Sequence, residues 1–426
     1  MQFFISEIAH KIIGNIRIAA VDEKYKKKEK LMMQSFVQYT PTKVVFGKDT
    51  QKEAGKLVSE LGITKVFLVY GGGSVIRSGL LDEIKKSLDE EHISYEELGG
   101  VKPNPRLSFA RKGVEKAIAF GAELILAVGG GSAIDTAKGI AIGAANPDTD
   151  IWEFWKNKKE LKKALPVGTV LTISAAGSEM SNSAVLTDEE TQDKSGIGSD
   201  LIRPKFAIMN PKLTYTLPKY QLTCGIVDIF MHTIERYFTP VHGNELTDEI
   251  AEGLMRTLIR NAAKAYENQE DYDAMSEIMW CGSISHNGIT GLGRPKDFLC
   301  HKLGHQLGAK FDEAHGATLS AVWGSWARYV YHLDEARFAN YGRKVWNIDE
   351  ENDEKTAVAA IEKTEEFFRS LHMPTCLGDM KMGVQPDEVL KEMAGKATAG
   401  DTMKVGAFQK MGEKELYEIY KKANHR

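Results

Sequence analysis

Between Phe36 and about residue 180, short runs rich in β-branched and aromatic residues alternate with stretches whose apolar residues recur at helical spacing. Such alternation is typical of βαβ units, in which parallel strands form one sheet that helices cover on both faces. We therefore expect an α/β domain in this part of the chain. The expected strands are 43–47, 65–70, 123–131 and 167–174, and the expected helices are 52–61, 79–92, 107–120 and 133–143.

The second half of the chain has a different pattern. After about Pro218, strand-like runs nearly vanish and long amphipathic stretches such as 248–268 and 354–371 take over. A chain of 426 residues, 42% of them apolar, also exceeds what one hydrophobic core normally serves. We therefore expect an α/β domain at 33–217, followed by an all-helical domain at 218–426.

Residues 1–32 are set apart as an N-terminal extension. Glu7 and Lys11 interrupt its apolar stretch, so it is a poor export signal. The dipeptide at 28–29, Lys-Glu, can be encoded by a bacterial ribosome-binding sequence, and Met32 and Met33 follow shortly. This favours the hypothesis of a misassigned start, with translation beginning at Met32 or Met33.

Composition excludes several classes of partner. The chain has 55 Lys and Arg against 59 Asp and Glu, a net charge of -4, which argues against nucleic-acid binding. No apolar run approaches the roughly 20 residues of a membrane-spanning helix. The four cysteines lack the paired spacing of a disulfide framework or a Cys-only zinc site, which favours a cytoplasmic protein with reduced thiols.

Two glycine-rich turns supply the first chemical signal. Gly71-Gly72-Gly73-Ser74 follows the strand KVFLVY, and Gly129-Gly130-Gly131-Ser132 follows ELILAV. Without side chains, the backbone of such a turn can approach a pyrophosphate, and the N–H groups that open the next helix point at the anion. One turn alone often serves only a tight connection. Two turns at the carboxyl ends of neighbouring parallel strands indicate a dinucleotide crevice, although neither matches the ordinary G-x-G-x-x-G pattern.

The helical half supplies a candidate metal site. Asp228 and His232 stand four residues apart and share one helix face, as do His301 and His305, and His315 follows shortly. Each histidine taken alone is more often structural than a ligand. Together, imidazoles and one carboxylate suit Fe(II) or Zn(II). Spacing alone does not choose between His305 and His315 as a ligand.

The chain resembles the iron-containing, group III alcohol dehydrogenases, in particular their butanol dehydrogenase and aldehyde reductase branch. The likeness covers nearly everything after Met33. It rests on GGGSAIDTAK at 129–138, P-N-P at 103–105, TISAAGSEMS at 172–181, the D-x-x-x-H motif from Asp228 and H-x-x-x-H-x-L-G from His301.

The resemblance implies a dehydroquinate synthase-like fold, with an α/β dinucleotide-binding domain and an all-helical metal domain. It implies that Asp228, His232, His301 and His315 hold the metal, with His305 beside the substrate as a proton carrier. The implied cofactor contacts are Gly71, Gly72, Gly73, Ser74, Asn104, Gly130, Gly131, Ser132, Asp135, Thr172, Ser178 and Lys194.

The implied activity is NAD(P)H- and iron-dependent interconversion of small aldehydes and primary alcohols of the butanal/butanol type. Polyol dehydrogenases and dehydroquinate synthase-type lyases share the fold and are alternatives, and a non-catalytic protein is a remote one. Tyr70 is followed by glycine and not by the acid that commonly holds an NAD ribose, which favours NADPH while allowing NADH. An exposed strand at 43–46 is expected to pair two copies in a homodimer.

Overall fold

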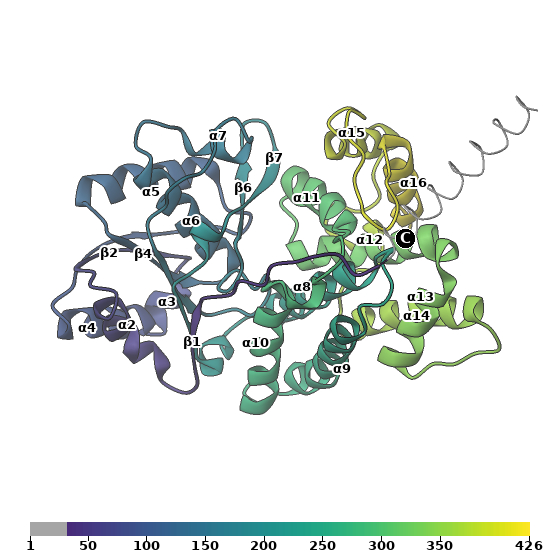
Figure 1. Cartoon of the computed structure of the whole chain (residues 1–426), viewed down its shortest axis with the longest axis horizontal. Helices are drawn as coiled ribbons and strands as arrows, with labels where there is room; N and C mark the ends of the chain where they lie inside the picture. Colours follow the sequence, from purple (N-terminus) through teal and green to yellow (C-terminus); the bar gives the residue numbers. More distant parts are fainter. Residues whose placement is uncertain (1–31) are drawn as a thin grey trace, which may run out of the picture.

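The protein folds into an α/β domain and a helical domain, which lie at the left and right of Figure 1. The structure is a computed structural model that describes residues 32–426. The proposed extension, and with it the hypothesis about the start, lies outside the described residues except for Met32. The segment after Met32 spans both domains: Gln34 N donates to Gly293 O at 2.8 Å, and Thr42 Oγ1 donates to Pro204 O at 2.7 Å.

A six-stranded parallel sheet forms the centre of the α/β domain, in the order β1-β8-β5-β4-β2-β3. A separate antiparallel hairpin, β6–β7, lies beside it. The strands are β1 (Lys43–Phe46), β2 (Lys65–Tyr70), β3 (Ser94–Gly99), β4 (Leu124–Gly129), β5 (Val167–Leu171), β6 (Ser183–Asp188), β7 (Asp193–Gly198) and β8 (Phe206–Met209). The helices are α2 (Ala54–Ser59), α3 (Ser74–Arg77), α4 (Leu80–Glu90), α5 (Leu107–Phe120), α6 (Gly131–Ala145) and α7 (Ile151–Trp155).

The βαβ prediction is confirmed, but four strands were missed. β3 lies at the sheet edge with only Leu98 buried, and its sequence SYEELG is too polar to be recognised as a strand. β8 has only four residues, and β6 and β7 contain Ser, Asp and Gly. Short or polar strands of this kind take their structure from their neighbours, because hydrophobic periodicity is weak over so few residues.

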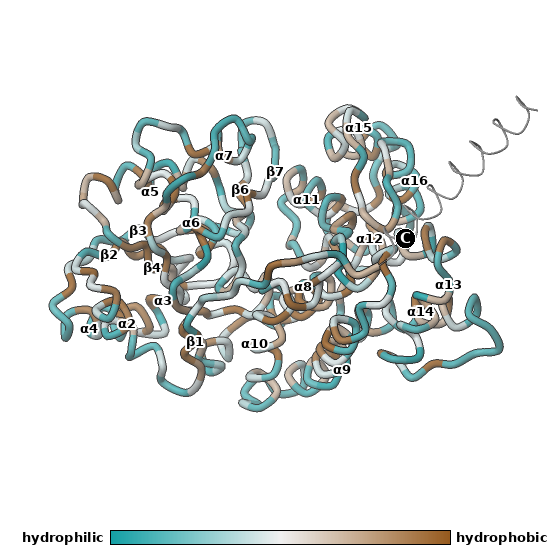
Figure 2. Tube along the Cα trace, in the orientation of Figure 1, coloured by the Kyte–Doolittle hydropathy of each residue, from teal (hydrophilic) through white to brown (hydrophobic). Residues whose placement is uncertain are grey.

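Two apolar layers cover the sheet. Leu68, Leu126 and Val128 face the layer that α2 and α4 complete, whereas Val69 and Ala127 face the layer of α5 and α6. This is the period-2 alternation expected for strands that are buried on both faces. Figure 2 shows hydrophobic segments around β4, with hydrophilic loops at the periphery.

The second domain is helical, as predicted. Its helices are α8 (Lys219–Tyr237), α9 (Glu245–Glu267), α10 (Tyr272–His286), α11 (Leu299–Phe311), α12 (His315–Val330), α13 (Glu335–Tyr341), α14 (Asp353–Ser370), α15 (Asp387–Ala397) and α16 (Glu413–Ala423). Its apolar core is built around α8 and α12, where Phe230, Phe238, Trp323 and Trp326 are fully buried. No helix within residues 32–426 is long and apolar enough to cross a bilayer.

Helix α8 is also one of the elements through which the two domains meet. At Gly225 it touches the backbone after β5, and a Cβ placed there would lie 2.2 Å from Ser174 O. The close approach therefore requires a residue without a side chain, since no real Cβ comes so near to a backbone oxygen.

Replacing Gly225 with Ala should separate the domains locally and lower the free energy of unfolding by about 1–3 kcal/mol, the usual cost of overpacking. Gly253→Ala is the matched control, because Gly253 lies within α9 and its added Cβ would meet only Arg256 Nη2, at 3.8 Å. The control should gain about 0.5–1 kcal/mol from helix propensity. Urea unfolding of both variants measures the difference, and equal stabilities would contradict the tight contact.

Candidate metal centre and cofactor site

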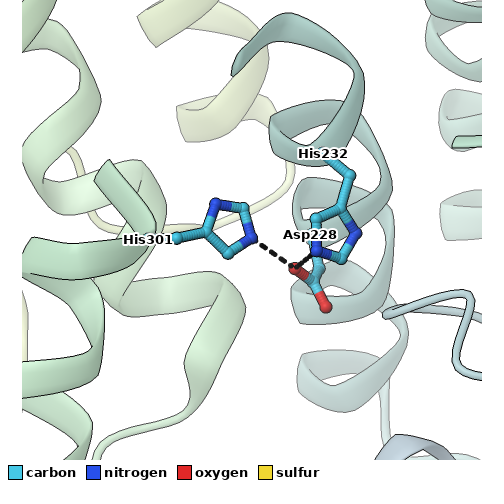
Figure 3. A group of neighbouring side chains, drawn as sticks. All are labelled: Asp228, His232 and His301. Carbon is cyan, nitrogen blue, oxygen red and sulfur yellow. Dashed lines mark ion pairs between the residues drawn. The ribbon is translucent and has the colours of Figure 1, made fainter. Parts of the chain in front are cut away.

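Helix α8 carries three acidic or histidine side chains on one face. Asp228, His232 and Glu235 follow one another at spacings of four and three residues, and all three are buried. His301 comes from α11, and His315 is the first residue of α12. Figure 3 shows His301 and His232 approaching the Asp228 carboxylate from the two helices.

Three imidazoles converge on one carboxylate oxygen. Asp228 Oδ1 lies 3.8 Å from His232 Nε2, 3.8 Å from His301 Nε2 and 3.6 Å from His315 Nε2. Ligand atoms held about 2.0–2.2 Å from one tetrahedral ion lie about 3.4 Å from each other. The spacing is therefore close to that of a shared cation.

The hydrogen bonding also fits a cation. Asp228 Oδ1 and His301 Nε2 are buried without a hydrogen-bond partner among the described residues. Burial without a partner is costly for a polar atom and more so for a charged one, so these atoms favour a bound ion. Burial lowers the pKa of both His232 and His315 well below its usual range, which leaves neutral rings whose lone pairs can coordinate a metal.

Glu235, which sequence reasoning missed, orients His301. Its Oε2 accepts from Nδ1 of His301, and its Oε1 accepts the backbone N–H of Cys300 at 2.7 Å. Although burial opposes it, Glu235 and Asp228 raise the pKa of His301 to about 9. A carboxylate behind a metal-facing histidine fixes the ring and increases its basicity. The signal was present in the sequence, because Glu235 follows Asp228 by seven residues on the same helix face.

The structure separates His305 from His315. The His305 ring centroid lies 6.3 Å from that of His301 and 5.4 Å from that of His315. Only the ligand atoms of Asp228, His232 and His301 all lie within 4.8 Å of one another among the described residues, and His315 joins this group through Asp228. The arrangement supports His315 as the fourth ligand and His305 as a neighbour.

The two glycine-rich turns lie side by side at the carboxyl ends of β2 and β4, which are paired. A Cβ at Gly130 would lie 1.8 Å from Ile173 Cγ2, so this turn has no room for a side chain. It opens α6, whose 15 residues provide a helix N-terminus for an anion. The first turn opens only α3, which has four residues, so the helix-dipole argument applies to the second turn.

Other expected cofactor residues are engaged inside the protein. Ser178 Oγ donates to Asp135 Oδ1 at 2.5 Å, and Thr172 N donates to Gly129 O at 3.1 Å. Lys194 Nζ donates to Asn104 Oδ1 at 2.8 Å. These bonds fix the positions of the residues within the protein, and their contacts with a nucleotide stay predictions.

Lys138 is a further residue that the sequence reasoning missed. It ends the GGGSAIDTAK motif, and its fully buried Nζ donates to Ser178 O at 2.7 Å, Ser181 O at 3.0 Å and Ser183 O at 2.8 Å. Burial lowers its pKa to about 8. Lys138 therefore holds the segment between β5 and β6 against α6.

Comparison with family models decides the identity. An iron-containing alcohol dehydrogenase model matches residues 41–211, and the C-terminal model of that family matches residues 223–424. The chain belongs to the iron-containing alcohol dehydrogenase family. This confirms the resemblance inferred from the sequence motifs, and the two models together span both domains.

Several relatives match along most of their length. NADH-dependent butanol dehydrogenase A of Clostridium acetobutylicum is 38% identical over 92% of this chain and 100% of the relative. NADPH-dependent aldehyde reductase YqhD of Escherichia coli is 37% identical over 82% of this chain and 89% of the relative. The crystal structure of NADH-dependent butanol dehydrogenase A from Thermotoga maritima superposes with a TM-score of 0.89 at 35% identity, covering 92% of this chain and all of that one.

Glu235→Gln should weaken Fe(II) binding about 10- to 100-fold, because the variant keeps the shape of the carboxylate but loses the charge behind His301. Glu252→Gln is the matched control: Glu252 is equally buried, but it accepts from the hydroxyl of Tyr237, away from the site. Anaerobic titration with Fe(II) measures both affinities. An unchanged affinity in Glu235→Gln would remove Glu235 from the site.

Proposed function

We propose that the protein interconverts small aldehydes and primary alcohols of the butanal/butanol type, with NAD(P)H as hydride donor and Fe(II) at the site on α8, α11 and α12. The observation that carries the proposal is the convergence of three imidazoles on the buried Asp228 carboxylate. The names of the relatives, butanol dehydrogenase and aldehyde reductase, supply the substrate class.

Asp228, His232, His301 and His315 would hold the ion. When bound, Fe(II) supplies a Lewis acid that polarises a carbonyl oxygen. Phe298 packs edge-on against two of these histidines, with its ring centroid 5.0 Å from that of His301 and 6.2 Å from that of His232. Glu235 keeps Nε2 of His301 turned toward the site.

His305 is the proposed proton carrier. Burial lowers its pKa well below the usual range, and Lys194 lowers it further, so the ring is neutral and has one nitrogen free to accept a proton. In alcohol oxidation it would accept the hydroxyl proton, and in aldehyde reduction it would return one. Its ring stands one helical turn from His301 and faces the same region.

A substrate panel tests the function directly. Enzyme loaded anaerobically with Fe(II) should consume NADH or NADPH with butanal, as followed by nicotinamide absorbance, and should lose this activity after chelation. Zinc-loaded enzyme serves as the comparison for the metal, and glycerol as the comparison for the substrate. A preference for glycerol would favour the polyol dehydrogenase alternative. Inactivity toward every aldehyde and alcohol would refute the proposal.

His305→Ala should keep its iron while kcat falls by roughly 10²-fold or more, the usual cost of losing a general acid or base. His315→Ala is the comparison and should lose iron, because its Nε2 lies 3.6 Å from Asp228. Metal analysis and kcat on both variants separate the roles. Loss of iron in His305→Ala with retention in His315→Ala would reverse the assignment.

Cofactor choice depends on the first glycine-rich turn. A Cβ at Gly73 would lie 2.3 Å from Arg77 Nη1, so the Arg77 guanidinium folds back over the turn. Together with Ser74 it supplies donors for a 2′-phosphate, and no acid stands there to repel one. We therefore propose that the enzyme accepts both cofactors and moderately favours NADPH.

Gly72→Asp should shift the preference toward NADH, because the new carboxylate would repel a 2′-phosphate. A Cβ at Gly72 meets nothing within 4 Å, so the substitution fits without strain. Gly72→Ala adds the same Cβ without charge and should keep the preference of the wild type. The ratio of kcat/KM for NADPH and NADH measures the effect, and equal ratios in wild type and Gly72→Asp would place the 2′-phosphate elsewhere.

We also propose that the protein acts as a homodimer in the cytoplasm. Within residues 32–426 the edge strand β1 pairs with β8 alone, and exposed apolar residues lie on and before it: Phe36, Val37 and Phe46 are 50%, 89% and 39% exposed. Trp280, 42% exposed, packs edge-on against Phe46. A second copy of the chain would cover this face. A mass of one chain, measured by light scattering, would contradict the homodimer.

The proposed cytoplasmic location is supported by the four cysteines, which are all free and fit a reducing compartment.

A further inference from the structure

A partly buried chain of polar side chains crosses from the α/β domain to helix α8. It begins at Ser183, the first residue of β6, whose Oγ lies 3.0 Å from Nε2 of His286 at the end of α10. The other ring nitrogen, Nδ1, lies 2.8 Å from Nη2 of Arg236 on α8. Arg236 Nη1 in turn donates to the backbone oxygen of His232 at 2.5 Å.

The direction of each hydrogen bond follows from the donors available. A guanidinium can only donate, so Nδ1 of His286 accepts from Arg236. Nε2 of the neutral ring therefore carries the proton and donates to Ser183 Oγ. One imidazole thus joins the two domains through both of its nitrogens.

Each end of this chain is fixed by a buried cation. At the α/β end, Lys138 Nζ donates to Ser183 O at 2.8 Å. At the helical end, the Arg236 guanidinium lies 4.6 Å from the centroid of the Phe298 ring, in cation–π contact. Arg236 and Lys138 are 3% and 0% exposed, so the loss of these contacts would leave a buried cation without its partners.

His286 also packs directly on a proposed metal ligand. Its ring centroid lies 4.1 Å from that of His232, with the two planes tilted by 38°. His232 is therefore connected to β6 in two ways, through the ring contact with His286 and through the Arg236 bond to the His232 carbonyl. Neither Arg236 nor His286 is a metal ligand or a cofactor contact in the mechanism above.

We propose that His286 is a positioning residue that ties the cofactor-binding domain to the His232 turn of α8 and so sets the distance between the nicotinamide ring and the substrate carbon that exchanges the hydride. The inference rests on the proposed function, because that distance matters only for hydride transfer. Rates of such transfers are sensitive to geometry, and a misplacement of 1 Å can cost about 10²-fold.

Two variants break the link at different points. Ser183→Ala removes the acceptor in the α/β domain and leaves the His286 ring in place. His286→Phe keeps a ring against His232 but removes both hydrogen bonds. Each should lower kcat about tenfold with less than about a twofold change in aldehyde KM, and should raise the primary isotope effect with cofactor deuterated at the transferable position.

The double variant tests whether both act through the same link. It should be no slower than His286→Phe alone, because the Ser183 bond is already lost. If the two losses of kcat multiply in the double variant, the proposal is overturned. His286→Gln, whose amide offers both an acceptor and a donor, should recover part of kcat. Ser285→Ala is the matched control, since Ser285 Oγ donates only within α10, to Gly282 O at 2.7 Å; it should behave as wild type.

Hydrogen exchange provides a readout that needs no turnover. In Ser183→Ala, amides of the segment 174–188 should exchange faster than in Ser285→Ala, with the iron content of both unchanged. If Ser183→Ala has the same exchange rates and the same kcat as Ser285→Ala, the Ser183–His286 bond does not position the domains and the proposal is overturned. An inactive wild type would refute the proposed function, whereas faster exchange in Ser183→Ala alone would still establish the link.

Discussion

The carboxylate of Asp228 constrains the structure around it. One of its oxygens is buried against three imidazole nitrogens and has no hydrogen-bond donor among the described residues. A buried anion in that state favours a cation among the same nitrogens. To bind such a cation, the surrounding helices must hold the four side chains at metal-ligand distances from one another. Glycines allow the helices to approach closely enough for this. A Cβ at Gly316 would lie 2.1 Å from Cys224 O, and one at Gly304 would lie 2.7 Å from Thr318 Oγ1.

The same constraint explains why α8 contacts both the metal site and the α/β domain. It supplies Asp228 and His232, and it meets the α/β domain at Gly225. On the far side of the site, Asn104 links the domains again, accepting from Lys194 and donating to Asp312 at 2.9 Å. Contacts on both sides limit how the crevice and the metal site can move relative to each other. A reaction between groups held by two different domains needs such a limit.

Sequence patterns identified what depends on local spacing. Asp228 and His232 were found because their four-residue separation defines a helix face, and the glycine-rich turns because each follows a strongly apolar strand. Glu235 shares the helix face of Asp228 and could have been found in the same way, whereas the roles of Arg236 and His286 depend on contacts between helices that no local pattern encodes. His305 and His315 were equivalent by spacing, and the difference between them appears only when α11 and α12 are packed against α8. Four strands were missed because their residues are few or polar.

The two glycine-rich turns look alike in sequence but differ physically. At the second turn, the Ile173 side chain leaves no space for a Cβ at Gly130, and a long helix follows, so close backbone approach and a helix dipole act together. At the first turn, Gly72 is exposed and open, α3 is a single turn of helix, and the Arg77 guanidinium lies over Gly73. We propose that the closed turn binds the pyrophosphate that NADH and NADPH share. The 2′-phosphate, which only NADPH carries, would lie at the open turn, where a Cβ at Gly72 meets no atom within 4 Å.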